Sequence, residues 1–247
     1  MPGDSQPARW NDAGRAAAPD APSPAASWHR RVAARLLTQL PLKAVGIPGF
    51  IALFFVGYFY LLRHPMFPVS IMPLIEFDRW VPFEPRALWL YVSLWVYVSL
   101  PPLLLASRRE LYAYGTHAAG LCLLGMACFL FWPTAVPPAD LIDSGEAGLS
   151  MLKGVDAAGN ACPSLHVATA VFSALFLDRQ LRELASPRAA AALNWLWCIG
   201  IVYSTMATRQ HVALDVLGGL ALGLAVGAAS LAAFRRLPAI PAFAGGR

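Results

Sequence analysis

Six apolar segments, each long enough or nearly so to cross a bilayer, constrain this 247-residue chain more than any other feature. They cover residues 44–62, 87–107, 112–132, 162–177, 190–206 and 212–234. A transmembrane helix needs about 20 predominantly apolar residues. Hydrophobic residues make up 57% of the chain and charged residues only 13%, against about 25% charged residues in a soluble domain. So much apolar surface must face lipid, and the sequence predicts an all-α, polytopic membrane protein with a bundle of six transmembrane helices.

Two of the six segments depart from a plain apolar span. Segment 162–177 is short and opens with polar residues, which predicts a helix whose outer end lies in protein rather than in lipid. Pro101 and Pro102 predict a kink in segment 87–107. Membrane bundles tolerate such a kink when neighbouring groups satisfy the freed carbonyls.

The lysines and arginines are distributed unevenly along the chain. With the N-terminus inside, 14 of the 19 fall in inner segments. The remaining five, on the outer side, are Arg63, Arg79, Arg86, Lys153 and Arg209. Because positive residues concentrate on the cytoplasmic side of membrane proteins, we expect a multi-pass protein of the cell membrane with both termini cytoplasmic. The same rule explains the net charge of +5 without a nucleic-acid partner.

The segments around the membrane domain differ in composition. Residues 1–28 are rich in Ala, Pro, Ser and Asp and lack apolar periodicity, which predicts a disordered cytoplasmic tail. Residues 29–43 combine arginines and leucines at helical spacing, which predicts a basic juxtamembrane segment. This segment either lies on the inner membrane surface or only fixes the topology. Residues 44–234 form the membrane domain, and residues 235–247 a second cytoplasmic tail.

Two short polar segments lie at the expected outer ends of apolar spans. The first, NACPSLH at 160–166, opens the fourth span. The second, TRQH at 208–211, is followed by Asp215 one helical turn into the sixth span. Ionisable groups at this depth are costly, and they indicate a functional site.

The residue types in these two segments suit a phosphate group. Both segments open helices at the same face, so backbone N–H groups and two helix dipoles could converge on an anion. Pro163 suits a first-turn position, where its missing N–H is no loss. Ser164 and Arg209 can donate hydrogen bonds to phosphate oxygens, the arginine through its planar fork.

The histidines supply the chemistry. His211 and Asp215 are four residues apart and therefore share one helix face. A carboxylate there holds one ring nitrogen protonated and leaves the other able to attack, as the third group of a catalytic triad does. His166, from another helix, could protonate the leaving oxygen. Asn160 is a further candidate for phosphate binding at this end.

These residues carry a resemblance to a known family. PSLH at 163–166, together with STMATRQHVALD at 204–215, resembles the second and third signature motifs of the phosphatidic-acid-phosphatase type 2 superfamily. The resemblance implies a six-helix membrane fold and a lipid phosphatase or headgroup transferase, with no cofactor and no metal ion. It also implies that His211 forms a phosphohistidine, that Asp215 orients it, that His166 is the acid and that Ser164 binds phosphate.

The chain departs from the family pattern in two places. The third motif usually has an arginine after its serine, but Thr205 follows Ser204, and Arg209 replaces that arginine in a form similar to the inositol-phosphorylceramide-synthase-like branch. The first motif, a lysine followed at a distance by Arg-Pro, is missing, and WPT at 132–134 stands in its place. The outer cations that could compensate are Lys153, Arg79 and Arg63.

The residues leave three classes of function open. The first is a metal-independent membrane lipid phosphatase that acts at the outer face, with a headgroup phosphotransferase of the inositol-phosphorylceramide or sphingomyelin synthase kind as its alternative. The second takes His166, His211 and Asp215 as a two-histidine, one-carboxylate metal site. The third is a non-enzymatic membrane transporter. Only the first explains Ser164 and Arg209, and it predicts a membrane lipid with a phosphate-containing headgroup as the partner.

Overall fold

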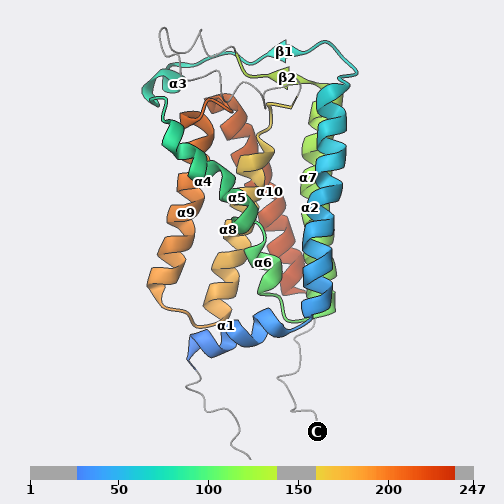
Figure 1. Cartoon of the computed structure of the whole chain (residues 1–247), viewed down its shortest axis with the longest axis vertical. Coiled ribbons are helices and arrows are strands. Elements are labelled where there is room, and N and C mark those ends of the chain that lie inside the picture. The colour runs from blue at the N-terminus through green and yellow to red at the C-terminus, as the bar shows by residue number, and fades with distance from the viewer. Residues whose placement is uncertain (1–26, 138–159, 237–247) are drawn as a thin grey trace, which may run out of the picture.

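The computed structural model describes residues 27–137 and 160–236 of the chain. Within these ranges the chain is a bundle of helices that run between two ends of the molecule (Figure 1). One end carries two short strands and α3 (Glu76–Trp80), and the other carries α1 (Trp28–Leu37). Nearly all of the predicted tails, residues 1–28 and 235–247, lies outside the described residues, and so does Lys153.

Four helices in the described ranges are long and apolar enough to cross a membrane. They are α2 (Leu40–Arg63), α7 (Arg108–Phe131), α9 (Arg188–Ala207) and α10 (Ala213–Arg235). They coincide with the first, third, fifth and sixth predicted spans, with ends that differ by a few residues. A mostly helical protein with several candidate membrane spans is thereby confirmed.

The fourth predicted span corresponds to α8 (Leu165–Glu183), which packs against α7, α9 and α10. Its N-terminal end is buried by protein, as predicted, since Leu165, His166 and Val167 are at most 8% exposed. Glycines of α10 allow the close approach. A Cβ atom at Gly219 would lie 2.4 Å from the Ser164 carbonyl oxygen, so the start of α8 rests directly on the backbone of α10.

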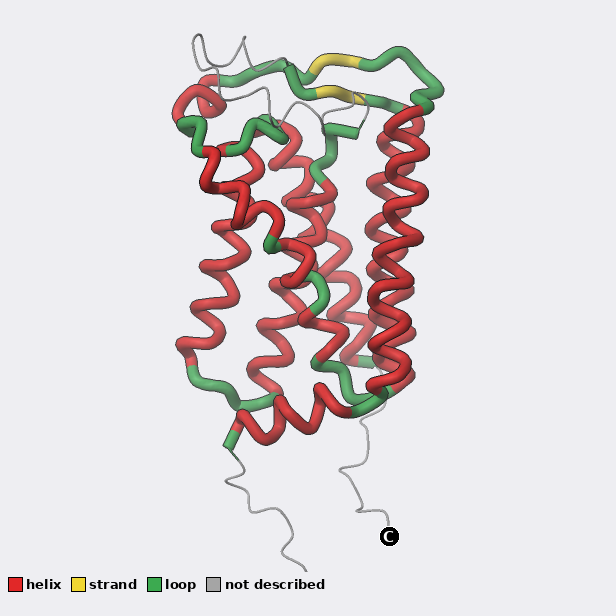
Figure 2. The backbone as a smooth tube through the Cα atoms, viewed as in Figure 1, coloured by secondary structure: helices red, strands yellow, loops and turns green. Residues whose placement is uncertain are grey.

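The second predicted span, for which we expected a kink at Pro101 and Pro102, is broken into short helices. After a 3₁₀ turn at Pro85–Ala87, the chain forms three short helices. They are α4 (Leu88–Val92), α5 (Leu94–Tyr97) and α6 (Leu100–Leu103). Pro101 and Pro102 lie in the first turn of α6, where the missing N–H groups prevent continuation of the preceding helix. The three pieces still lead from the α3 end towards the α1 end (Figure 2).

The predicted juxtamembrane segment 29–43 contains all but the first residue of α1 and the first turn of α2. α1 lies across the end of the bundle (Figure 1). Arg35 pairs with Glu183 at 3.3 Å, and the Lys43 ammonium donates to the main-chain carbonyls of Arg35 and Leu103 at 2.6 and 2.8 Å. These bonds attach the segment to the ends of α6 and α8.

Two short strands, which the sequence did not predict, hold the opposite end together. β1 (Ser70–Ile71) pairs in parallel with β2 (Thr134–Ala135), and Asn160 adds an isolated bridge to Thr134. This pairing joins the loop after α2, the end of α7 and the segment that leads into α8. It therefore lies over the end of the bundle where α8 and α10 begin.

Candidate active site

His211 and Asp215 form a close pair at the start of α10. His211 Nδ1 lies 3.5 Å from Asp215 Oδ2, which is within ion-pair distance but outside hydrogen-bond geometry. The Asp215 side chain is fully buried and the His211 side chain is 10% exposed. The predicted pairing is thus present in the structure. With Nδ1 towards the carboxylate, Nε2 is the nitrogen that can attack a substrate.

The local backbone explains this arrangement. The Thr205 carbonyl accepts hydrogen bonds from the Gln210 and His211 amides, both at 3.0 Å, and Arg209 adopts a left-handed conformation with φ 59°. The chain thereby reverses between α9 and α10. Asp215 Oδ2 also accepts the Val212 N–H at 3.0 Å, so the carboxylate that faces the histidine caps the helix as well.

His166 approaches from the first turn of α8. Its ring stacks on Tyr91 with centroids 3.9 Å apart and planes 12° apart, and it hydrogen-bonds to the Tyr91 main chain. Trp95 meets the same ring edge-on at 6.4 Å. His166 and His211 line one cavity, so the fold brings the two predicted catalytic histidines together from different elements.

Ser164 is the N-cap of α8. Its Oγ accepts the Val167 N–H at 3.3 Å, and its own N–H donates to the Asp215 carbonyl at 3.0 Å. Pro163 precedes the cap instead of occupying the first turn, which corrects the prediction. The reason is that serine offers a side-chain acceptor at the cap and proline does not. The hydroxyl of Ser164 still has a hydrogen to donate, so phosphate binding by this residue stays a prediction.

The N-terminus of α10 is already occupied by carboxylates. Asp215 takes the Val212 amide, and Asp78 Oδ1 accepts the Ala213 N–H at 2.6 Å. The prediction that both helix starts offer free amides to an anion is therefore wrong for these two amides of α10. At α8 the first hydrogen bond from one turn to the next is donated by the Ala168 amide. The His166 amide lies before this bond, at the start of the helix.

The sequence reading missed Asp78, which is only 2% exposed. Besides the Ala213 amide, it accepts the Ile75 N–H at 2.8 Å and so caps α3 as well. The signal in the sequence was slight: one aspartate in an aromatic, proline-rich loop. A buried carboxylate needs partners, and here they lie 3 and 135 residues away along the chain.

Residues 78–91 contact the candidate site at four points. Asp78 caps α10, and Tyr91 stacks on His166. Between them, the Val81 carbonyl accepts a hydrogen bond from Arg209 Nη1 at 2.9 Å, and the Glu84 amide donates to the Ala207 carbonyl at 2.9 Å. Arg209 is 7% exposed and is thus held beside the site, and phosphate binding by this residue stays a prediction.

Two of the three predicted replacements for the missing first-motif cation, Arg79 and Arg63, lie in the described ranges, and neither lines the cavity of the histidines. Arg79 is largely exposed and pairs with Glu76 at 3.5 Å. Arg63 is exposed and lies over the Phe59 ring at 5.8 Å. Lys153 lies outside the described residues. Neither arginine is therefore placed to compensate for the missing charge.

The WPT segment holds the first polar segment in place. Thr134 Oγ1 accepts the Cys162 N–H at 2.7 Å, and the Thr134 carbonyl accepts the Ala161 N–H at 3.0 Å. Asn160 lines the same cavity as the histidines and donates through Nδ2 to the Tyr58 carbonyl at 3.1 Å. The structure thus brings the candidate Asn160 to the site.

Unpaired polar atoms concentrate at this end of the bundle. In the described ranges, eight buried side-chain atoms have no hydrogen-bond partner, and four of them belong to these residues. The four are Asn160 Oδ1, His166 Nε2, His211 Nδ1 and Asp215 Oδ1. Each unpaired buried group costs about 1–3 kcal/mol, so such a cluster indicates a site built for a ligand. Within the same ranges, no three His, Cys, Asp or Glu side chains are arranged to hold a metal ion.

Comparison with known proteins bears on the part of the chain that contains the site. Searches of curated proteins and of solved structures gave no match. A family model matches residues 116–238, just under half of the chain, from within α7 to just beyond α10. The matched range contains both polar segments. The family model that matches residues 116–238 is that of the PAP2 superfamily.

Proposed function

We propose that the chain is a membrane lipid phosphatase of the PAP2 superfamily that works through a phosphohistidine. The observation that carries the proposal is that His211, which pairs with the buried Asp215, lines the same cavity as His166 of another helix. The unpaired polar atoms of these three residues support it.

The geometry suggests a two-step reaction. His211 Nε2 attacks the phosphorus atom, the bond to the leaving oxygen breaks, and His166 gives that oxygen a proton. Asp215 stabilises the positive charge that develops on the His211 ring. His166 then takes a proton from water, which attacks the phosphohistidine, breaks the P–N bond and releases phosphate. The two histidines that these steps use line the same cavity, which supports this sequence of steps.

The same proposal includes six spans, with α8 and the broken run α4–α6 joining the four long helices. Arginines gather at the α1 end of the molecule. In the described ranges they include Arg30, Arg31, Arg35, Arg108, Arg109, Arg179, Arg182, Arg188 and Arg235. By the positive-inside rule this end is cytoplasmic, so both termini lie inside and the histidines lie at the outer face.

The decisive test is phosphate release from a panel of lipid phosphates by the purified protein, with chelator present. We expect release that vanadate inhibits, and acid-labile phosphate bound to the wild-type protein. The His211→Ala variant should show neither. Release by that variant at the normal rate would overturn the mechanism. Adding ceramide or diacylglycerol to labelled phospholipid distinguishes the synthase alternative, since headgroup transfer would then outpace phosphate release.

A further inference from the structure

An apolar cavity of about 740 Å³ extends from the candidate site into the bundle. His166 and His211 line its outer end, and Lys43 lines its inner end. Its walls come from α2 on one side and from α4–α8 on the others. The cavity is therefore continuous with the site and leads away from it along the helices.

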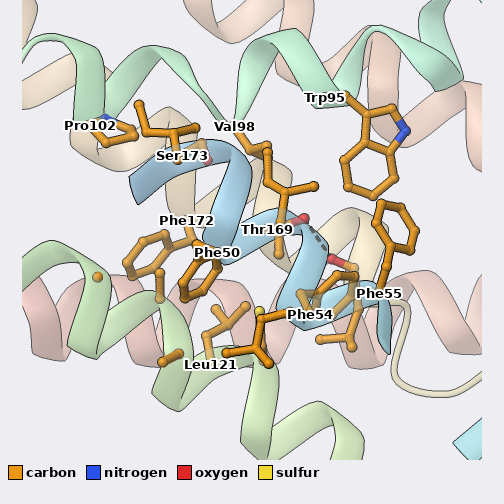
Figure 3. A pocket seen from close by; sticks show the side chains of 18 of the residues that line it. Phe50, Phe54, Phe55, Trp95, Val98, Pro102, Leu121, Thr169, Phe172 and Ser173 are labelled. Atoms are coloured by element: carbon orange, nitrogen blue, oxygen red, sulfur yellow. Dashed lines mark hydrogen bonds between the residues drawn. The ribbon is translucent and has the colours of Figure 1, made fainter. Parts of the chain in front are cut away.

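The lining of the cavity suits hydrocarbon. Figure 3 shows Phe50 and Phe54 of α2 with Leu121, Phe172 and Trp95 of the facing helices around the hollow. The hydroxyl of Thr169, one of the few polar groups, already donates to the Leu165 carbonyl at 2.8 Å. Walls of this kind bind an apolar ligand, and the few polar groups at one end fix its orientation.

The length of the cavity exceeds one leaflet of the membrane. Tyr58 marks the outer end, because its carbonyl binds Asn160, and Lys43 marks the inner end. The two positions are 15 residues apart on α2, which corresponds to about 22 Å at 1.5 Å per residue. Half of a hydrocarbon core about 30 Å thick is about 15 Å. A chain that fills the cavity from the outer face passes the bilayer midplane.

A polar floor closes the inner end. Lys43 is 1% exposed, and its ammonium donates to the main-chain carbonyls of Arg35 and Leu103. These bonds join the end of α1, the start of α2 and the end of α6. A hydrocarbon chain cannot extend past Lys43, because it would have to break the hydrogen bonds of the buried ammonium group.

We propose that the cavity holds one hydrocarbon chain of the substrate and that its length selects lipid phosphates whose chain is longer than one leaflet. The inference rests on the proposed function, since the phosphate must lie at the histidines for the chain to lie in the cavity. It adds a substrate class: a lipid phosphate with one chain that reaches past the midplane.

Two glycines allow the cavity to be filled without disturbing its walls. Gly46 of α2 and Gly115 of α7 line its inner half, and a Cβ atom at either would meet nothing within 4 Å. Gly49 and Gly120 lie on the same helices with equally open surroundings, but they are not among the lining residues. Gly49→Leu and Gly120→Leu are thus matched controls for Gly46→Leu and Gly115→Leu, with the same gain in helix propensity.

The assay is phosphate release from lipid phosphates that share a headgroup and differ in chain length. For the wild type we expect kcat/KM to rise until the chain exceeds one leaflet. Gly46→Leu and Gly115→Leu should lower kcat/KM for the longest chain about 10-fold, the loss expected when roughly two methylene groups are displaced. The shortest substrate and both control variants should be unaffected. Equal kcat/KM at all lengths, or equal losses in the controls, would overturn the proposal.

A second measurement distinguishes failure of the proposed function from failure of the proposed chain site. A long-chain lipid phosphate with a diazirine at its terminal carbon should cross-link to the start of α2 around Lys43 and Gly46. If no lipid phosphate is hydrolysed but this label appears, the proposed function fails and the chain site stands. If hydrolysis occurs without this label, the chain site fails alone.

Discussion

Replacing Asp78 should impair catalysis although this residue has no predicted part in the chemistry. Its Oδ1 accepts the Ala213 N–H at 2.6 Å, in the first turn of the helix that carries Asp215. Ala213 is 4% exposed, so water cannot replace the lost acceptor easily. Asp78→Ala leaves this amide unpaired. Asp78→Asn keeps one acceptor oxygen for Ala213, and it loses the charge and the second oxygen, which accepts the Ile75 N–H.

The structure sets the size of both effects. A buried unpaired amide costs about 1–3 kcal/mol of stability, and loss of charge assistance alone costs about 1 kcal/mol. The catalytic effect follows from position: a displacement of reacting groups by about 1 Å lowers the rate about 100-fold. We therefore expect Asp78→Ala to lower kcat about 100-fold with little change in KM, and Asp78→Asn to restore most of the loss.

The assay is steady-state phosphate release by purified variants, with thermal unfolding followed in parallel. Arg79→Ala is the matched control, because Arg79 is the next residue on α3 and its side chain is 69% exposed. It should behave as wild type. A normal kcat for Asp78→Ala, or an asparagine variant no better than alanine, would refute the idea that Asp78 positions the start of α10.

Three further predictions concern the catalytic residues and the topology. His211→Ala should abolish turnover and the acid-labile phosphate, and Asp215→Asn should lower turnover about 10⁴-fold, as loss of the orienting carboxylate does in serine proteases. Arg209→Lys should impair turnover almost as much as Arg209→Ala, since lysine lacks the planar fork; a lysine variant near wild type would remove the arginine from phosphate binding. Single cysteines placed within 133–161 should react with an impermeant label from outside and those within 178–189 should not, and the reverse pattern would put the site in the cytoplasm.

Parts of this structure follow directly from the sequence because their causes are local. A helix in lipid must satisfy its own backbone, so a long apolar run is sufficient to predict α2, α7, α9 and α10. The approach of His211 to Asp215 follows likewise from a spacing of four residues.

Other parts could not be predicted because their causes lie far apart along the chain. The bond between Asp78 and Ala213 joins residues 135 positions apart. The strands β1 and β2 have two residues each, too few to show a periodic pattern. The break of the second span at Pro101 was expected as a kink, but apolar composition alone did not indicate three separate helices.

Ser164 shows a different limit of sequence reading. At the start of a helix a serine can donate to an anion and an aspartate can orient a histidine, and both can equally cap the helix themselves. The residue types are the same in both cases, and only the structure shows that Ser164 accepts the Val167 amide and that Asp215 accepts the Val212 amide. A motif therefore predicts the place of such residues better than their function.

The caps at the two helix starts also bear on where a phosphate would lie. Asp78 and Asp215 both accept amides at the start of α10, so negative charge already sits at that positive helix end. An anion added there would be repelled by two carboxylates. The start of α8 is capped by a neutral hydroxyl, and His166 lies in its first turn. We therefore expect the phosphate to lie against α8, with the His211 ring between it and Asp215.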